Sequence, residues 1–142
     1  MQQVFFNYAD MSLRIQDAKK VKPFLAAIFR REKKKMQQVN FVFCSDNFLL
    51  EINRSFLNHD YYTDIITFPL QEKGMPVIGE IYISAERVKE NSKLFRTTIK
   101  QEMLRIIIHG VLHLCGYDDK TKKGKKIMTE KEDFYLSLYN KA

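Results

Sequence analysis

The order of local patterns along this sequence predicts an α+β domain. Four segments have the composition of β-strands, and about five show the apolar spacing of helices. The 142 residues suit a single domain, residues 1–142, that buries a core of its own. Apolar residues make up 45% of the chain and charged residues 29%, which is typical of globular proteins that stay in water.

The N-terminal part of the sequence predicts a strand, a helix and a second strand. Residues Val4–Tyr8 are rich in aromatic side chains and are typical of a strand. Apolar residues then recur at helical spacing over Leu13–Arg31, an interval that includes Pro23. Because proline disfavours the interior of a helix, we expect the regular helix to begin near Pro23 or to bend there. The β-forming residues of Val39–Cys44 indicate a buried strand.

A capped helix and a loop are predicted next. Ser45 or Asp46 is suited to cap a helix that continues to about Leu57. The expected apolar side of this helix consists of Phe48, Leu49, Ile52 and Phe56. Residues 58–69 then predict a loop that leads into a third strand.

The second half of the chain predicts one more strand and three helices. The alternating pattern of Gly79–Ser84 indicates the strand, and Ser84 is suited to cap a helix that ends near Leu94. Residues Thr121–Tyr139 predict the last helix. Its expected apolar face consists of Ile127, Met128, Phe134, Leu138 and Tyr139.

Between these two helices, residues Thr98–Cys115 predict a buried helix. Thr98 and Gln101 fit the capping box, in which a hydroxyl residue is followed three positions later by an amide. One face repeats apolar residues at offsets of three and four: Ile99, Met103, Ile106, Ile107, Val111 and Leu114. Ile108 and Leu112 are apolar but lie outside that face, so we expect the helix to be covered on most sides.

Two histidines on this helix suggest a metal site. His109 and His113 are four residues apart, so their imidazoles project from one face of the helix. Gly116 can adopt a positive φ angle, end the helix and bring Asp118 or Asp119 back over that face. Two nitrogens, one carboxylate oxygen and a water match a catalytic zinc site with one open position. The alternative is that the histidines are only packed or capping residues.

The segment from His109 to Asp119, HGVLHLCGYDD, resembles the signature of the YbeY family of ribosomal-RNA maturation factors. Ten of its eleven positions are compatible with that signature. The exception is Asp119, which stands where the family usually has a third histidine ligand. The resemblance implies that His109, His113 and Asp119 hold the metal, and Asp118 matches the aspartate that precedes the third ligand. Zinc accepts an oxygen ligand, so zinc is the expected metal, with one ion per chain.

Residues 53–69 and 79–84 extend the resemblance. The departure that matters is Leu57, which occupies the position of a family arginine with a functional role. Because leucine cannot bind phosphate, we consider Arg54, three residues earlier on the same helix, as a substitute or as a simple exposed arginine. His59 is expected to be a loop residue rather than a fourth ligand.

The net charge of +7 favours an acidic partner such as nucleic acid. Positive residues cluster in two runs: Arg30, Arg31, Lys33, Lys34 and Lys35, and then Lys120, Lys122, Lys123, Lys125 and Lys126. We interpret the first run as a solvated face. The second run directly follows the predicted metal site, so Lys120, Lys122 and Lys123 are the candidates for binding an RNA backbone.

The resemblance implies a fold and an activity. We expect a four-stranded mixed sheet with the histidine-bearing helix central in the helical layer. The implied activity is that of a metal-dependent single-strand endoribonuclease in ribosomal-RNA processing, including the 3′ end of the small-subunit RNA, and in ribosome quality control. The expected partners are ribosomal RNA and the small ribosomal subunit, with no small-molecule cofactor. Asp118 is a candidate for orienting a metal-bound water, and no residue is identified as a general base.

Two other functions remain open at the level of sequence. One is a non-catalytic ribosome-assembly factor with a structural metal, because Leu57 removes one expected functional arginine. The other is a zinc metallopeptidase, which is disfavoured because Gly110 stands where such enzymes carry a glutamate as general base. No apolar run is long enough to cross a membrane, and Cys44 and Cys115 form no disulfide framework. We therefore expect a cytoplasmic protein with no membrane association and with reduced thiols.

Overall fold

Four strands form one mixed sheet in the order β1-β2-β4-β3. In this computed structural model, which describes residues 3–12 and 14–141, the strands are β1 Gln3–Tyr8, β2 Met36–Cys44, β3 Ile65–Pro69 and β4 Val77–Ser84. β1 and β4 run parallel to β2, whereas β3 runs antiparallel to β4. The short strand β3 therefore forms one edge of the sheet.

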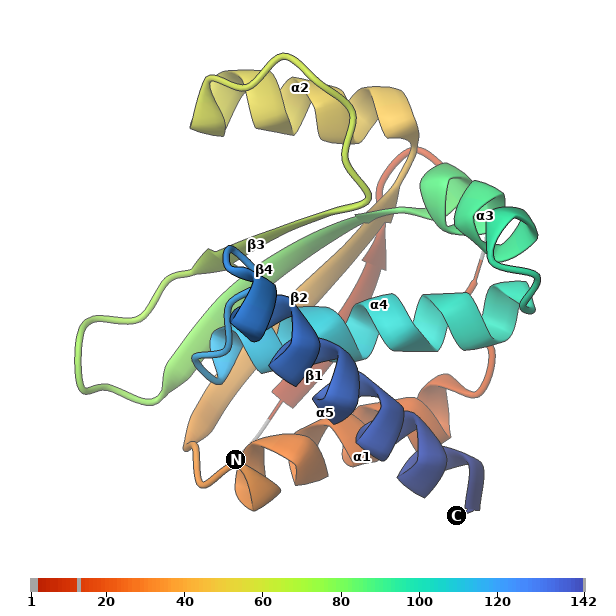
Figure 1. The fold of residues 1–142 in the computed structure, drawn as a ribbon. Helices are drawn as coiled ribbons and strands as arrows, with labels where there is room; N and C mark the ends of the chain where they lie inside the picture. Colours follow the sequence, from red (N-terminus) through yellow and green to blue (C-terminus); the bar gives the residue numbers. More distant parts are fainter. Residues whose placement is uncertain (1–2, 13, 142) are drawn as a thin grey trace.

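Five helices lie around this sheet in the described part of the chain, and they confirm the predicted α+β class. They are α1 Ala18–Arg31, α2 Asp46–Leu57, α3 Ala85–Leu94, α4 Ile99–Leu114 and α5 Lys122–Lys141. Figure 1 shows α1, α4 and α5 stacked over one face of the sheet, while α2 stands apart on the other side. None of the helices in the described residues has the length and apolar character needed to cross a membrane.

The main core lies between the sheet and the layer that contains α4. Alternate residues of the two central strands point into it, and Phe41, Phe43, Ile81 and Ile83 are fully buried. On the opposite face of the sheet, Cys44 and Ile66 form a smaller cluster with Leu49 of α2. Both cysteines are free and buried, where a cysteine packs as a small apolar side chain.

Helix α4 is central in the helical layer, as expected. Ile108 and Leu112 are completely buried even though they lie off the predicted apolar face, whereas Ile99 remains 44% exposed. The Thr98 hydroxyl accepts a hydrogen bond from the Gln101 backbone N–H, which is half of the predicted capping box. The other half is absent, because the Gln101 side chain hydrogen-bonds to Asn140 on α5 instead.

Two glycines allow α4 to lie close to the sheet. A Cβ atom at Gly110 would lie 3.0 Å from Ile81 Cδ1 and 3.1 Å from Ile65 Cδ1. A Cβ atom at Gly79 of β4 would lie 2.6 Å from Leu114 Cδ1, near the end of α4. The C-terminal half of α4, which carries both histidines, is thereby held against β4 and the edge strand β3.

The first helix differs from its prediction. Leu13 lies outside the described residues, and α1 begins at Ala18, five residues before Pro23. The expected start near Pro23 is therefore wrong. Pro23 lies inside α1, where it can contribute no backbone N–H to the helix, and the buried side chains of Val21, Leu25, Ile28 and Phe29 stabilise the helix by packing.

Two amphipathic faces were also predicted incorrectly in part. Phe56 of α2 is 69% exposed, and the buried residues of that helix are Leu49, Leu50 and Asn53. Ile127 and Phe134 of α5 are exposed, and that helix buries Met128, Glu132, Tyr135, Leu136 and Tyr139. The buried stripe of α5 therefore includes the carboxylate of Glu132. A carboxylate is rarely buried without a partner, so we expect Glu132 to interact with another polar group.

The burial of α4 predicts a large effect on stability. We expect Ile108→Ala to lower the free energy of unfolding by about 2–5 kcal/mol, because it removes buried methyl groups and leaves a cavity. Ile99→Ala is a matched control on the same helix and should change it by less than about 1 kcal/mol, since Ile99 is partly exposed. Urea denaturation measures both values, and equal losses in the two variants would contradict the central position of α4.

Candidate metal centre

The two histidines of α4 and the aspartate after it come together as predicted. One ligand atom from each of His109, His113 and Asp119 lies within 4.8 Å of the other two. The Nε2 atom of His109 is 3.4 Å from Asp119 Oδ2, and the Nε2 atom of His113 is 3.6 Å from Asp119 Oδ1. The helix supplies the first two groups, and the turn after it returns the third to the same face.

These distances suit a small divalent cation. In a tetrahedron with metal–ligand bonds of about 2.0–2.1 Å, neighbouring ligand atoms are separated by roughly 3.3 Å. Each histidine nitrogen lies close to that distance from one oxygen of Asp119, which is Oδ2 for His109 and Oδ1 for His113. Two imidazoles and one carboxylate are also a donor set that zinc accepts, and three protein ligands leave one position open.

A buried carboxylate on α5 orients the first histidine. His109 Nδ1 lies 2.6 Å from Glu132 Oε2, so the ring donates this N–H to Glu132 and presents Nε2 to the site. The other oxygen of Glu132 accepts a hydrogen bond of 2.9 Å from Arg105, which also pairs with Asp133. A carboxylate behind a ligating histidine fixes the ring and increases its basicity, as in many zinc sites.

The two imidazoles differ in their electrostatic surroundings. Burial lowers the pKa of His109, but the hydrogen bond and negative charge of Glu132 outweigh burial and leave the pKa above its usual value. Burial also lowers the pKa of His113, and the neighbouring His109 lowers it further. A histidine ligand must be neutral, so a cation at His109 competes with protonation of the ring, which the raised pKa favours.

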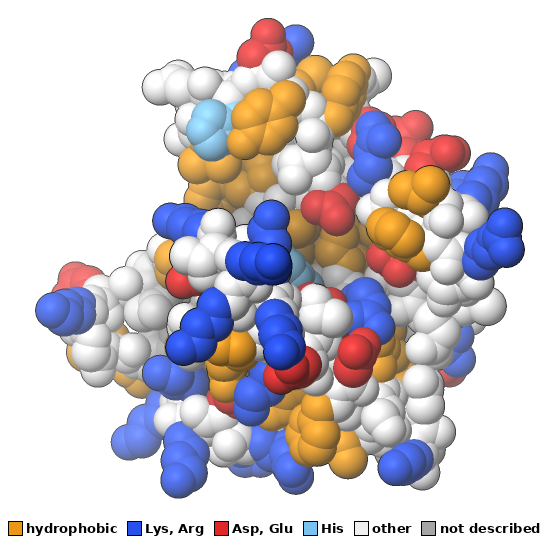
Figure 2. All heavy atoms as spheres, in the orientation of Figure 1, with side chains coloured by type: hydrophobic (Ala, Val, Ile, Leu, Met, Phe, Trp, Pro, Cys, Tyr) orange, Lys and Arg blue, Asp and Glu red, His pale blue; other side chains and the backbone are white. Residues whose placement is uncertain are grey.

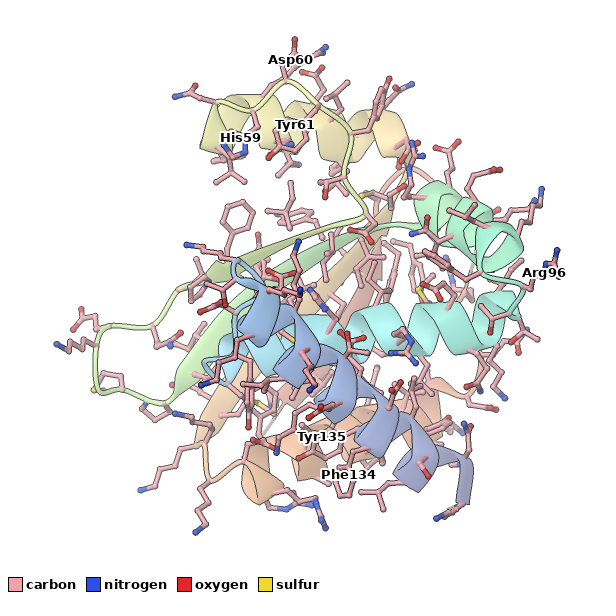
Figure 3. All side chains as sticks on the ribbon, in the orientation of Figure 1. His59, Asp60, Tyr61, Arg96, Phe134 and Tyr135 are labelled. Atoms are coloured by element: carbon pink, nitrogen blue, oxygen red, sulfur yellow. The ribbon has the colours of Figure 1, made fainter. Side chains whose placement is uncertain are left out.

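The turn that carries Asp119 is anchored from the opposite end of the chain. Gly116 has a φ of +106°, which ends α4 and redirects the backbone as predicted. The carboxylate of Glu32, just after α1, accepts hydrogen bonds from the hydroxyls of Tyr117 and Tyr135 and from Lys131 Nζ. Figure 3 shows Tyr135 in the space between α5 and α1. The turn is thus tied to both terminal helices.

The neighbouring Asp118 does not join the cluster. Its Oδ1 atom accepts a hydrogen bond of 3.2 Å from the Lys120 backbone N–H, so it stabilises the turn before α5. It lines a small recess with Thr121 and Gly124, whereas Asp119 lines the cleft of the two histidines. The structure therefore separates the two aspartates, one toward the start of α5 and one toward the candidate metal centre.

The other predicted site residues lie outside this cluster. Lys120, Lys122 and Lys123 are exposed just before and in the first turn of α5. Arg54 on α2 is partly exposed and pairs with Glu51 and Asp60. His59 lies in the loop after α2, as expected, and its ring nitrogen Nδ1 is 2.9 Å from the Tyr61 hydroxyl.

A cleft of about 480 Å³ opens above the cluster and contains one acid that the sequence reasoning did not assign. Its walls include Thr63 and Asp64 from the loop before β3 and residues of β3 itself. Figure 2 shows a hollow between α2 and the start of α5, with histidine visible inside it and basic side chains around its lower border. Burial raises the pKa of the Asp64 carboxyl. Asp64 lies in residues 53–69, the segment that resembles the YbeY family, and this resemblance was the sequence signal that could have identified it.

The fold and this cluster define an α+β protein whose central buried helix carries a potential site for a metal ion. Residues 6–140 match the family described as Endoribonuclease YbeY, and the chain belongs to this family. The resemblance inferred from the sequence is thereby confirmed.

Relatives of similar length support the same assignment. A protein of Cytophaga hutchinsonii named Endoribonuclease YbeY is 45% identical over 135 residues, which cover 95% of this chain and 94% of that protein. One of Flavobacterium psychrophilum with the same name is 40% identical over 137 residues and 96% of each chain. The solution structure of a Thermotoga maritima protein superposes with a TM-score of 0.68 at 32% identity, covering 97% of this chain and 89% of that one.

The separation of the two aspartates predicts which one binds metal. We expect Asp119→Ala to lose metal, because it leaves only two ligands, and Asp119→His to retain it, because imidazole replaces carboxylate on zinc. Asp118→Ala is the matched control and should retain metal. Metal content after gel filtration measures all three. If Asp119→Ala retains metal and Asp118→Ala loses it, the third ligand is Asp118 instead of Asp119.

The contact behind His109 gives a second prediction for this site. Glu132→Gln keeps the size of the side chain but removes its charge, so we expect zinc affinity to fall by roughly tenfold or more. Asp133→Asn is the matched control, because Asp133 also pairs with Arg105 but does not contact His109. Competition with a chromogenic chelator gives both affinities, and equal affinities would show that Glu132 does not support the histidine.

Proposed function

We propose that this protein is a metal-dependent endoribonuclease that cleaves single-stranded RNA. The observation that carries the proposal is the cluster of His109, His113 and Asp119 at the bottom of an open cleft, in a chain of the YbeY endoribonuclease family. The proposed cellular task is ribosomal-RNA processing, including the 3′ end of the small-subunit RNA, together with ribosome quality control. Its partners are then ribosomal RNA and the small subunit, in the cytoplasm.

The proposed chemistry divides between the metal and the protein. Zinc, bound by these three residues, supplies a Lewis acid that polarises a phosphoryl oxygen and makes water more acidic. Glu132 holds the His109 ring in the tautomer that offers Nε2 to the site. Asp64 faces the same cleft, and its raised pKa suits a carboxylate that accepts a proton during hydrolysis.

Lys120, Lys122 and Lys123 are proposed to bind the phosphate backbone. They are exposed around the start of α5, and Figure 2 places a concentration of basic side chains there, at the border of the hollow. Lysines in such a position attract RNA of any sequence and orient it over the cleft. Arg54 remains a weaker candidate for this task, because Glu51 and Asp60 already neutralise its guanidinium group.

The non-catalytic alternative has one supporting feature. Leu57 is 38% exposed at the end of α2, and a leucine there binds no phosphate. A ribosome-assembly factor with a structural metal is consistent with that loss. The open cleft supports catalysis instead, since structural zinc sites are usually closed by a fourth protein ligand.

A zinc metallopeptidase is less consistent with the surroundings of α4. The residue after the first histidine is Gly110, which packs against Ile65 and Ile81 of the sheet. A glutamate at this position would have to enter that contact rather than the cleft. The protein therefore lacks a general base at the position where a zinc metallopeptidase of this type carries one.

Cleavage assays test the proposal directly. We expect the zinc-loaded protein to cut labelled single-stranded RNA and to leave casein intact, and we expect His113→Ala to lose RNA cleavage because it removes a ligand. Lys89→Ala, an exposed residue of α3, controls for the effect of a surface substitution. RNA cleavage that survives in His113→Ala would reject the proposal, as would casein cleavage that depends on His113.

A further inference from the structure

Aromatic rings are exposed on the loop between α2 and β3. Tyr61 is 56% exposed, and its ring stacks on that of His59 with a centroid distance of 5.1 Å and an interplanar angle of 22°. Phe56, at the end of α2, is 69% exposed and meets Phe68 edge to face. We call Phe56, His59 and Tyr61 the aromatic platform. Burial in the core accounts for none of these three rings.

The loop holds two members of the aromatic platform, His59 and Tyr61, in a defined position. The side-chain amide of the buried Asn53 donates a hydrogen bond of 2.9 Å to the Tyr61 backbone carbonyl, and the His59 N–H donates to the Asn53 carbonyl. Arg54 pairs with Asp60 between the two rings in sequence. Rings that are exposed yet fixed lose little conformational entropy when a ligand stacks on them.

The aromatic platform lies next to the cleft of the metal centre. The chain continues from Tyr61 through Tyr62 into Thr63 and Asp64, which line that cleft. Figure 3 places His59 and Tyr61 along the loop in front of α2, on the face where the cleft opens in Figure 2. The basic side chains at the start of α5 lie across the hollow. The rings of His59 and Tyr61 thus lie beyond one side of the cleft, and cations lie beyond the other.

We propose that the aromatic platform stacks the bases of single-stranded RNA while the lysines across the cleft bind its phosphates; this inference rests on the proposed function. Unpaired bases stack on aromatic side chains, and this contact requires no particular sequence. The exposed Leu57 follows Phe56 in the chain and stands where the family has an arginine. This side of the cleft is therefore apolar, which suits contact with bases rather than with phosphates. RNA fits both borders, since it carries apolar base faces and anionic phosphates on one strand.

The test compares two probes of equal length and charge. One is a 2′-O-methyl RNA of mixed sequence, and the other is the same backbone without bases. We expect Tyr61→Leu to weaken binding of the first probe by roughly five- to a hundredfold and to leave the second unchanged. Tyr61→Phe should bind both probes as the wild type does, because the ring remains. Phe95→Leu is the matched control, since Phe95 is exposed outside this loop.

A second set of variants separates stacking from charge. Changing Lys120, Lys122 and Lys123 together to glutamine should weaken both probes and flatten the dependence of affinity on salt, whereas Tyr61→Leu should keep the wild-type salt dependence. The inference is overturned if Tyr61→Leu behaves like Phe95→Leu, as it would if this surface binds a protein, or if it weakens both probes equally. Wild-type protein that neither binds nor cleaves RNA would instead reject the proposed function.

Discussion

The rest of the structure depends on how closely α4 packs on the sheet. Gly110 on the helix and Gly79 on β4 leave space for the side chains of Ile81 and Leu114, so two backbones approach where larger residues would hold them apart. This contact places His109 and His113 beside the edge strand β3 rather than above the middle of the sheet. The cleft can then open outward at that edge while α1, α3 and α5 cover the remaining sides of the helix.

Charge around the cleft is arranged by depth. Carboxylates lie around the histidines, where Asp119 and Asp64 line the cleft and Glu132 lies behind His109. Cations are concentrated outside, at the start of α5. A divalent ion is attracted to these acids, and a polyanion is attracted to the basic border without having to lie directly against the acids. The acids and the lysines therefore attract different ligands, a cation and a polyanion, to the same cleft.

Three features that local sequence determines were predicted well. The histidine spacing, the Thr98 cap and the glycine turn at Gly116 all act over a few residues. Features that depend on contacts between residues far apart in the sequence were not predicted. Glu132 lies 23 residues from His109 on a helix whose buried stripe was assigned to other side chains, and only the packing of α5 reveals the pair. Phe56 has helical apolar spacing, but at the end of α2 it meets Phe68 of β3 edge to face and stays 69% exposed.

The bonds around Glu32 have a consequence for the order of folding. They join residues that are 85, 99 and 103 positions apart in sequence, and such long-range contacts are slow to form because closing large loops costs entropy. Helix α4 can form early from its own local contacts, whereas the turn that carries Asp119 becomes fixed only after both terminal helices dock. A partly folded chain therefore has two of the candidate ligands without the third, and the complete candidate metal centre belongs to the native state.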